Sequence, residues 1–208
     1  MPRIVELLIV FTALLFLIIP IAVTGAALYL ALGSPVFFRQ TRVGKDFRVF
    51  DILKYRTMTN DVDENGKLLP DEMRQTRFSK FIRRVRLDEL PQILAIAKGD
   101  MALVGPRPLL PQTIESFGEL GIERCKVRPG LTGWSQVNGN VNLTNAQKLK
   151  LDLWYVYHRS LLLDFKIIVA TIGVVLFGEN VNDDRITTAE SWLREVGLAE
   201  QFENKEFV

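Results

Sequence analysis

Two adjacent carboxylates, Asp88 and Glu89, follow a basic run that contains Arg83, Arg84 and Arg86. Adjacent side chains of a helix point about 100° apart, so this pair cannot flank a substrate from opposite sides as the carboxylates of glycoside hydrolases do. The pair suits divided roles, with one group as a nucleophile or metal ligand and the other as a neighbouring base. A structural role is also open, because Asp88 would cap a helix and Glu89 would suit its first turn.

Cations on stiff segments would supply the phosphate-binding groups of such a site. Arg107 stands between Pro106 and Pro108, and a planar guanidinium on a rigid loop suits a phosphate. An ion pair inside the fold is the alternative. Further candidates for phosphate contacts are Lys54, Arg56, Lys126 and Arg128. Several cations beside two carboxylates are typical of phosphoryl transfer assisted by Mg²⁺.

The sequence lacks the residue patterns of several other kinds of functional site. There is no GxxxxGK[ST] or GxGxxG phosphate-binding loop. The single cysteine, Cys125, excludes an internal disulfide, and together with the single histidine, His158, it excludes a Cys/His zinc site. The cysteine usage fits a reducing compartment.

Residues 7–32 form a run of 26 residues without a charged side chain. About 20 are enough to cross a bilayer, and the apolar core of a cleaved signal peptide is shorter. Pro20 lies near the middle, where a proline kinks or breaks a helix. Two topologies follow, a kinked spanning helix and a re-entrant helix that turns back at Pro20. The cations at 39, 42, 45 and 48 place the body on the cytoplasmic side in both cases.

The charge is unevenly distributed along the chain. Residues 33–88 hold 13 Lys and Arg against 8 Asp and Glu, whereas residues 151–208 hold 5 against 10. The basic stretch suits anionic lipid headgroups or a phosphorylated substrate, although an ordinary solvated surface is an equal alternative.

The remaining pattern predicts short elements that position these residues. A hairpin is expected from residues 36–40 and 48–54, and a capping box at Thr144 opens a helix. Ile167–Phe177 is apolar but too short to span a membrane. The other predicted elements are helices over 78–85, 88–98 and 111–121, a turn over 183–186 and a helical tail over 189–208.

Five segments, taken in order, resemble the bacterial sugar transferases, which are the monotopic phosphoglycosyl transferases. The chain is similar in particular to the small PglC-type members, which carry one membrane segment. The segments are residues 33–44 (GSPVFFRQTRVG), 54–58 (KYRTM), 87–92 (LDELPQ), 99–109 (GDMALVGPRPL) and 126–134 (KVRPGLTGW).

The resemblance implies a reaction. Enzymes of this family move sugar 1-phosphate from a UDP-sugar to polyprenyl (undecaprenyl) phosphate and release UMP, the first membrane step of glycoconjugate and polysaccharide biosynthesis. By resemblance, Asp88 is the nucleophile of a covalent aspartyl-phosphosugar intermediate and the ligand of the cofactor Mg²⁺. Glu89 assists as ligand or base, and Arg107 holds a phosphate. The further substrate-binding residues are expected to be Lys54, Arg56, Lys126 and Arg128.

The resemblance also implies an architecture of the α/β class, mostly α. A re-entrant membrane helix over 1–32, broken at Pro20, precedes a compact cytoplasmic domain of amphipathic helices with a small β-hairpin over 33–188. An acidic C-terminal tail follows over 189–208. The expected location is the cytoplasmic face of a bacterial inner membrane. The expected partners are the two substrates and membrane lipid, with a homodimer or glycosyltransferases of the same pathway in addition. No nucleic acid is expected, because aromatic residues are barely interleaved with the basic stretch.

Three positions depart from the family pattern. Ile19 replaces the serine that precedes the mid-helix proline, Asn140 stands where an arginine is frequent, and His158 stands where an asparagine is frequent. The last two bear on the identity of the sugar, for which the PglC-type members suggest an N-acetylated amino sugar. The alternative function is a catalytically inactive, membrane-anchored scaffold of a polysaccharide assembly complex, which would not require Asp88, Glu89 and Arg107.

Overall fold

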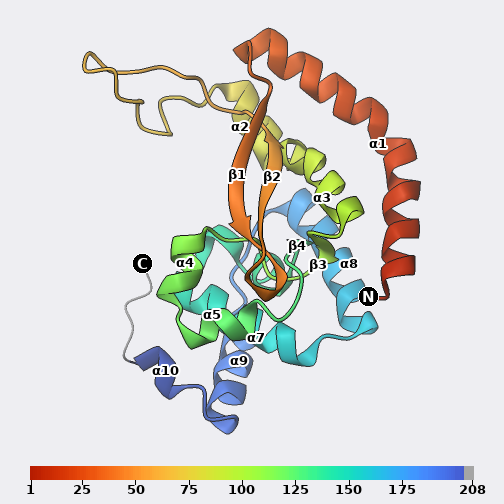
Figure 1. Ribbon diagram of the computed structural model, residues 1–208, viewed down its shortest axis with the longest axis vertical. Helices are drawn as coiled ribbons and strands as arrows, with labels where there is room; N and C mark the ends of the chain where they lie inside the picture. The colour runs from red at the N-terminus through yellow and green to blue at the C-terminus, as the bar shows by residue number, and fades with distance from the viewer. Residues whose placement is uncertain (204–208) are drawn as a thin grey trace.

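One long helix lies along the side of a body of short helices and two small sheets (Figure 1). In this computed structural model, residues 1–203 are described. The mostly helical composition with a small hairpin confirms the predicted fold class. The elements are α1 (Arg3–Leu32), β1 (Phe37–Val43), β2 (Val49–Tyr55), α2 (Arg77–Arg84), η2 (Leu87–Gln92, a 3-10 helix), α3 (Ile93–Lys98), β3 (Ala102–Val104), α4 (Pro111–Ser116), α5 (Glu119–Arg124), β4 (Gly130–Thr132), α6 (Trp134–Val137), α7 (Asn145–His158), α8 (Leu161–Phe177), α9 (Asp183–Glu195) and α10 (Glu200–Glu203), with single 3-10 turns η1 (Lys45–Phe47) and η3 (Asn140–Asn142).

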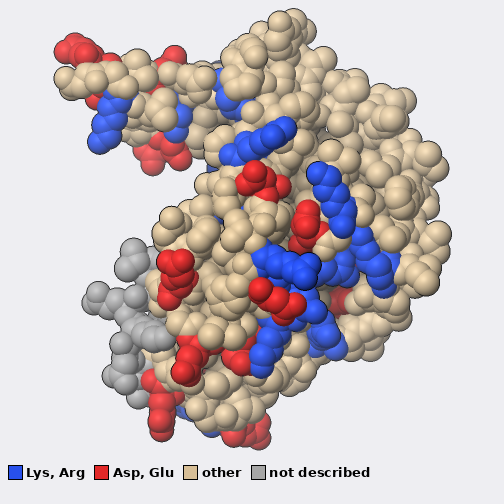
Figure 2. Space-filling view, in the orientation of Figure 1, with Lys and Arg blue, Asp and Glu red and all other residues tan. Residues whose placement is uncertain are grey.

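Helix α1 is long and apolar enough to cross a membrane, and most of its side chains are exposed. It stays helical through Pro20 but bends part-way along its length (Figure 1). The right-hand edge of Figure 2, where α1 lies, is free of charged side chains. Two of its residues, Val10 and Leu28, are fully buried in separate core clusters of the body.

Both ends of α1 are tied to this same body. At the start, the Arg3 guanidinium donates hydrogen bonds of 2.7 and 3.0 Å to the carbonyl oxygens of Ile96 and Ala97, at the end of α3. At the other end, the Arg56 guanidinium donates to the carbonyl oxygens of Leu32 and Gly33 at 2.6 and 2.8 Å. The helix is therefore attached to the body at both ends.

The predicted hairpin is present as β1 and β2, which pair antiparallel with Phe37 opposite Tyr55 and Val43 opposite Val49. It connects the end of α1 to the middle of the body (Figure 1). Ile52 of β2 is fully buried in the cluster that α1 and α3 share. This burial fixes the strand that carries Lys54.

The segment with the two carboxylates differs from the single helix predicted over 88–98. Residues 87–92 form η2, and the α-helix α3 begins only at Ile93. Pro91 lacks a backbone donor, and Arg86 ahead of η2 has a left-handed backbone with φ 58°. Both features interrupt regular α-helical hydrogen bonding, and the tighter 3-10 turn results.

The loop that carries Arg107 lies against the strand β4. Strands β3 and β4 are parallel, with Ala102 opposite Gly130. A Cβ atom added to Gly130 would lie 2.1 Å from the backbone nitrogen of Gly105, so the two backbones meet where only glycine fits.

Three element predictions in the C-terminal half need correction. The helix predicted over 189–208 is interrupted, since α9 ends at Glu195 and α10 begins at Glu200. The predicted turn over 183–186 is the first turn of α9, whose cap is Asn182: its side chain accepts a hydrogen bond from the backbone nitrogen of Arg185. The predicted helix over 111–121 is divided into α4 and α5 at Gly118, where φ is 57°. Ala189 and Leu193 of α9 are buried in the core, and the last five residues of the predicted tail lie outside the described residues.

Candidate active site

A cleft of about 450 Å³ brings together the two carboxylates and a group of cations. Its walls come from β2, the end of α2, η2, the loop after β3, the turn η3 and the end of α8. The charged and polar residues that line the cleft are Lys54, Arg83, Arg84, Arg86, Asp88, Glu89, Arg107, Asn140, Asn142 and Glu179.

Glu89 is the buried anchor of this cluster. One carboxylate oxygen, Oε1, accepts from Lys54 Nζ at 2.9 Å and from the Arg107 guanidinium at 2.7 Å. The other, Oε2, lies 3.5 Å from the Arg86 guanidinium. Burial raises the pKa of Glu89, but the positive charges of Arg107 and Lys54 outweigh it and lower the pKa to about 2. Glu89 is therefore held ionised, with both oxygens engaged.

Asp88 has the opposite environment, although it is the next residue. Burial and the negative charge of Glu89 raise the pKa of Asp88 to about 6. Within residues 1–203, no other side chain hydrogen-bonds to its carboxylate or lies within ion-pair distance. Paired groups whose pKa values are pushed apart mark a division of catalytic roles. Asp88, whose carboxylate accepts a hydrogen bond from its own backbone and forms no hydrogen bond or ion pair with another side chain of the described residues, is the carboxylate available to react or to bind a cation.

Arg107 is positioned through its backbone by a buried ion pair. Its side chain donates to Glu89, and its carbonyl oxygen accepts a hydrogen bond of 2.6 Å from the Arg124 guanidinium. Arg124 in turn contacts Asp152 at 2.7 Å, and Ser135 donates to the second oxygen of Asp152 at 2.7 Å. Sequence reasoning missed this network. Its one signal is the charge of Asp152 between Leu151 and Leu153 in α7, where all three side chains are buried.

Glu179, also missed, closes the cleft from the end of α8. It accepts hydrogen bonds from Arg86 at 2.5 Å and from the Asn140 side chain at 2.6 Å. Asn140, one of the three departures from the family pattern, has a left-handed backbone with φ 45° and lies in the wall of the cleft. His158, another departure, stacks on Trp154 with ring centroids 4.4 Å apart and does not line the cleft.

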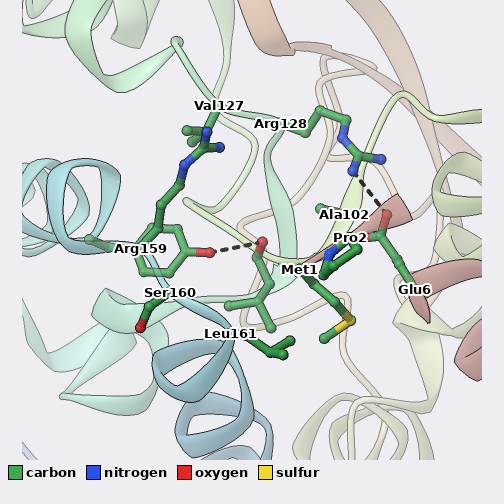
Figure 3. Close-up of a pocket in the computed structure, with 11 residues that line it drawn as sticks. Met1, Pro2, Glu6, Ala102, Val127, Arg128, Arg159, Ser160 and Leu161 are labelled. Carbon is green, nitrogen blue, oxygen red and sulfur yellow. Dashed lines mark hydrogen bonds and ion pairs between the residues drawn. The ribbon is translucent and has the colours of Figure 1, made fainter. Parts of the chain in front are cut away.

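Three cations predicted to bind substrate lie elsewhere. Arg56 is buried and holds the end of α1, as described above, with a further hydrogen bond of 2.6 Å to the Pro35 carbonyl oxygen. Lys126 is exposed and pairs with Glu123 at 2.6 Å. Arg128 pairs with Glu6 at 2.9 Å in a separate cavity of about 310 Å³ at the start of α1 (Figure 3). Of the predicted residues, the cleft gathers Lys54, Asp88, Glu89 and Arg107.

The cleft offers a divalent cation few protein ligands. Residues 1–203 contain no group of three or more His, Cys, Asp or Glu side chains able to hold a metal ion. Mg²⁺ commonly binds through one or two carboxylates and takes its remaining ligands from water and substrate phosphates. The unengaged Asp88 carboxylate fits this mode of binding.

Comparison with known proteins gives consistent matches. Residues 1–178 match the bacterial sugar transferase family. The chain is similar to the uncharacterized sugar transferase EpsL of Bacillus subtilis (strain 168), at 44% identity over 86% of this chain and 91% of the relative. It is 38% identical to the UDP-glucose:undecaprenyl-phosphate glucose-1-phosphate transferase of Escherichia coli (strain K12), over 77% of this chain and 37% of the relative. It is also 38% identical to the UDP-N-acetylgalactosamine-undecaprenyl-phosphate N-acetylgalactosaminephosphotransferase of Aeromonas hydrophila, over 74% and 38%. The chain thus spans little more than a third of these two longer relatives.

Proposed function

Because the chain belongs to the bacterial sugar transferase family, we propose that it transfers sugar 1-phosphate from a UDP-sugar to a polyprenyl phosphate. The products are UMP and a polyprenyl diphosphate-sugar. The printed names of relatives support this reaction class, since they pair UDP-sugars with undecaprenyl phosphate. The observation that carries the proposal is the arrangement of the two carboxylates in the cleft. Glu89 is paired with the surrounding cations, whereas the neighbouring Asp88 forms no ion pair with another described residue.

Asp88 is proposed as a nucleophile. One carboxylate oxygen of Asp88 attacks the phosphorus that bears the sugar, the bond from that phosphorus to the bridging oxygen breaks, and UMP leaves. An oxygen of the polyprenyl phosphate then attacks the same phosphorus, and the Asp88 carboxylate is released. Two steps at one phosphorus would give ping-pong kinetics. This role requires a carboxylate oxygen that is not held in an ion pair, and Asp88 forms no ion pair with another described side chain.

The cations and the saturated carboxylate have supporting roles in this scheme. Arg107 and Lys54 are held by Glu89 at the edge of the cleft, where they neutralise phosphate charge that increases during transfer. Mg²⁺, with Asp88 as its protein ligand, would supply further neutralisation of the diphosphate. Glu89 positions both cations, because its Oε1 atom accepts a hydrogen bond from each of them.

The acceptor reaches the cleft from the membrane, and α1 is proposed to be re-entrant. Both ends of α1 contact one body, whereas a spanning helix would place its ends on opposite sides of the bilayer. This arrangement supports a body that rests on one face of the membrane. The basic residues after α1 favour the cytoplasmic face.

A UMP-release assay tests the proposed function. Purified protein in nanodiscs receives Mg²⁺, undecaprenyl phosphate and a panel of UDP-sugars that includes glucose, galactose and their N-acetylated amino forms. The proposal requires UMP release with at least one donor, dependent on the acceptor lipid, and the same assay names the sugar. Tight binding of a UDP-sugar without any UMP release would overturn the proposal in favour of a scaffold.

A further inference from the structure

A second, smaller cavity of about 200 Å³ continues the cleft beyond Arg107. The two cavities share Arg107, Asn140 and Val141 in their walls. The rest of the second cavity comes from the loop before α4 and from α4–α7. A substrate seated at Asp88 can therefore extend past Arg107 without leaving the protein surface.

The two cavities differ in what surrounds them. The cleft has Val174, Val175 and Leu176 of α8 in its wall, and Leu176 and Phe177 are 67% and 84% exposed on the outside of that helix. This apolar edge suits the lipid acceptor. No lining residue of the second cavity belongs to α1, α2 or α8. The second cavity therefore extends the cleft away from this apolar edge and offers space for the part of the donor beyond the phosphates.

The polar groups of the second cavity divide into engaged and free ones. Arg124, Asp152 and Ser135 satisfy one another at its base. Asn145 and Lys148 also line it, and their side chains make no hydrogen bond or ion pair within residues 1–203. They stand three residues apart in the first turn of α7, so they face the same side of the helix. Leu109 and Leu149 supply apolar wall.

These free groups match one chemical class. An asparagine amide presents a donor and an acceptor side by side, which complements the adjacent imide N–H and carbonyl oxygen of a uracil ring. A lysine ammonium three residues away suits the ribose oxygens or the phosphate next to them. The apolar walls suit the faces of a flat base.

We propose that the second cavity is the nucleoside site of the donor, in which Asn145 reads the uracil edge and Lys148 contacts the ribose phosphate. This inference rests on the proposed function, because it takes the donor to be a UDP-sugar. It divides the substrate at Arg107, with the sugar phosphate and the lipid on the Asp88 side and the nucleoside on the Asn145 side.

Equilibrium binding of UMP and CMP to the full-length protein in nanodiscs tests the assignment. Asn145→Asp keeps the size of the side chain but removes the amide donor, and should weaken UMP binding about tenfold. An aspartate accepts from the cytosine amino group, so the preference for UMP over CMP should fall or reverse in this variant. Lys148→Ala should weaken both nucleotides by a similar factor. The matched control is Lys150→Ala, on the same helix but paired with Glu190 outside the cavity, which should bind as wild type does.

The outcomes separate this inference from the proposed function. UMP release by the wild-type protein, with unchanged UMP and CMP affinities in both the Asn145→Asp and Lys148→Ala variants, would overturn the nucleoside site alone. Variant-sensitive UMP binding without turnover would support the site while overturning the transferase. Thermal unfolding of each variant, and Asn145→Ala as a second substitution, exclude loss of fold as the cause of weak binding.

Discussion

The Arg124 guanidinium bridges a carboxylate and a carbonyl oxygen: it contacts Asp152 at 2.7 Å and donates to the Arg107 backbone at 2.6 Å. Both partners of the ion pair are at most 3% exposed. Buried charge pairs are costly to break, because the remaining partner is left without compensation. The geometry of Arg107 in the cleft thus depends on charges that do not line that cleft.

We expect Arg124→Met to destabilise the protein by about 3–5 kcal/mol, since it leaves Asp152 buried without its cation. Denaturant or thermal unfolding in detergent measures the loss. The double variant Arg124→Met/Asp152→Asn removes the orphan charge and should recover part of the stability. A double variant as unstable as the sum of the two single variants would show that the two residues do not interact.

Asp88→Asn should abolish UMP release while UMP binding stays within about twofold of wild type. The amide cannot form the covalent bond to phosphorus, but the nucleotide contacts lie elsewhere. The UMP-release assay and equilibrium binding report the two quantities separately. Wild-type turnover in this variant would remove Asp88 from the nucleophile role.

The raised pKa of Asp88 predicts a stability cost that appears as pH increases. A carboxyl whose folded pKa of about 6 exceeds its usual value of 3.8 binds its proton more tightly in the folded protein. The contribution of protonated Asp88 to the free energy of unfolding is fully present below about pH 4 and is lost as pH rises through 6. Asp88→Asn should therefore be more stable than wild type at pH 8, by on the order of 2 kcal/mol. Thermal unfolding without Mg²⁺ from pH 4 to 8 measures this difference, and a difference independent of pH would contradict it.

Arg56→Ala should lower the stability of the protein by about 2 kcal/mol, because it leaves the carbonyl oxygens of Leu32, Gly33 and Pro35 without their donor. The exposed Lys126→Ala is the matched control and should change stability by less than about 0.5 kcal/mol. Detergent unfolding measures both. A raised KM for the UDP-sugar in Arg56→Ala, measured under conditions in which the variant stays folded, would support the substrate-binding role predicted for this residue from the sequence.

The proposed re-entrant topology predicts the accessibility of both ends of α1. In a Cys125→Ser background, cysteines at Pro2 and Ser34 should both resist a membrane-impermeant thiol reagent applied to the outside of spheroplasts. Both should react in inverted vesicles. Labelling of one position from each side would instead establish a spanning helix.

The sequence predicted the parts of the site that are local in the chain. The hairpin, the capping box at Thr144 and the rigid loop around Arg107 each depend on residue types within a few positions, and all three are present. Lys54 and Glu89 are 35 residues apart, so their pairing depends instead on how β2 packs against η2. No pattern in the sequence distinguishes Lys54, near the end of β2, from Arg56, just after that strand, although Lys54 lies in the cleft and Arg56 binds the end of α1.

The missed residues have the same explanation. Glu179, just after α8, and Asp152, in α7, are both far from residues 88–107 in the sequence, and their charge alone did not separate them from solvent-facing acids. A proline in the first turn of a helix is compatible with α-helical structure, so Pro91 alone does not argue against the helix predicted over 88–98. Together with the left-handed backbone of Arg86, however, it produces the 3-10 turn. Local rules predicted the hairpin and the helix that begins after Thr144, whereas the neighbours of each charge are set by tertiary packing.

The burial of Val10 and Leu28 inside the body has a practical meaning for anyone working with this protein. Deleting residues 1–32 to obtain a soluble fragment would open two cavities in the interior and remove one of the carbonyl acceptors of Arg56, that of Leu32. The apolar helix is therefore part of the folded core and does not serve only as a membrane anchor. Expression, crystallisation and inhibitor screening would all require the intact chain in a lipid or detergent environment.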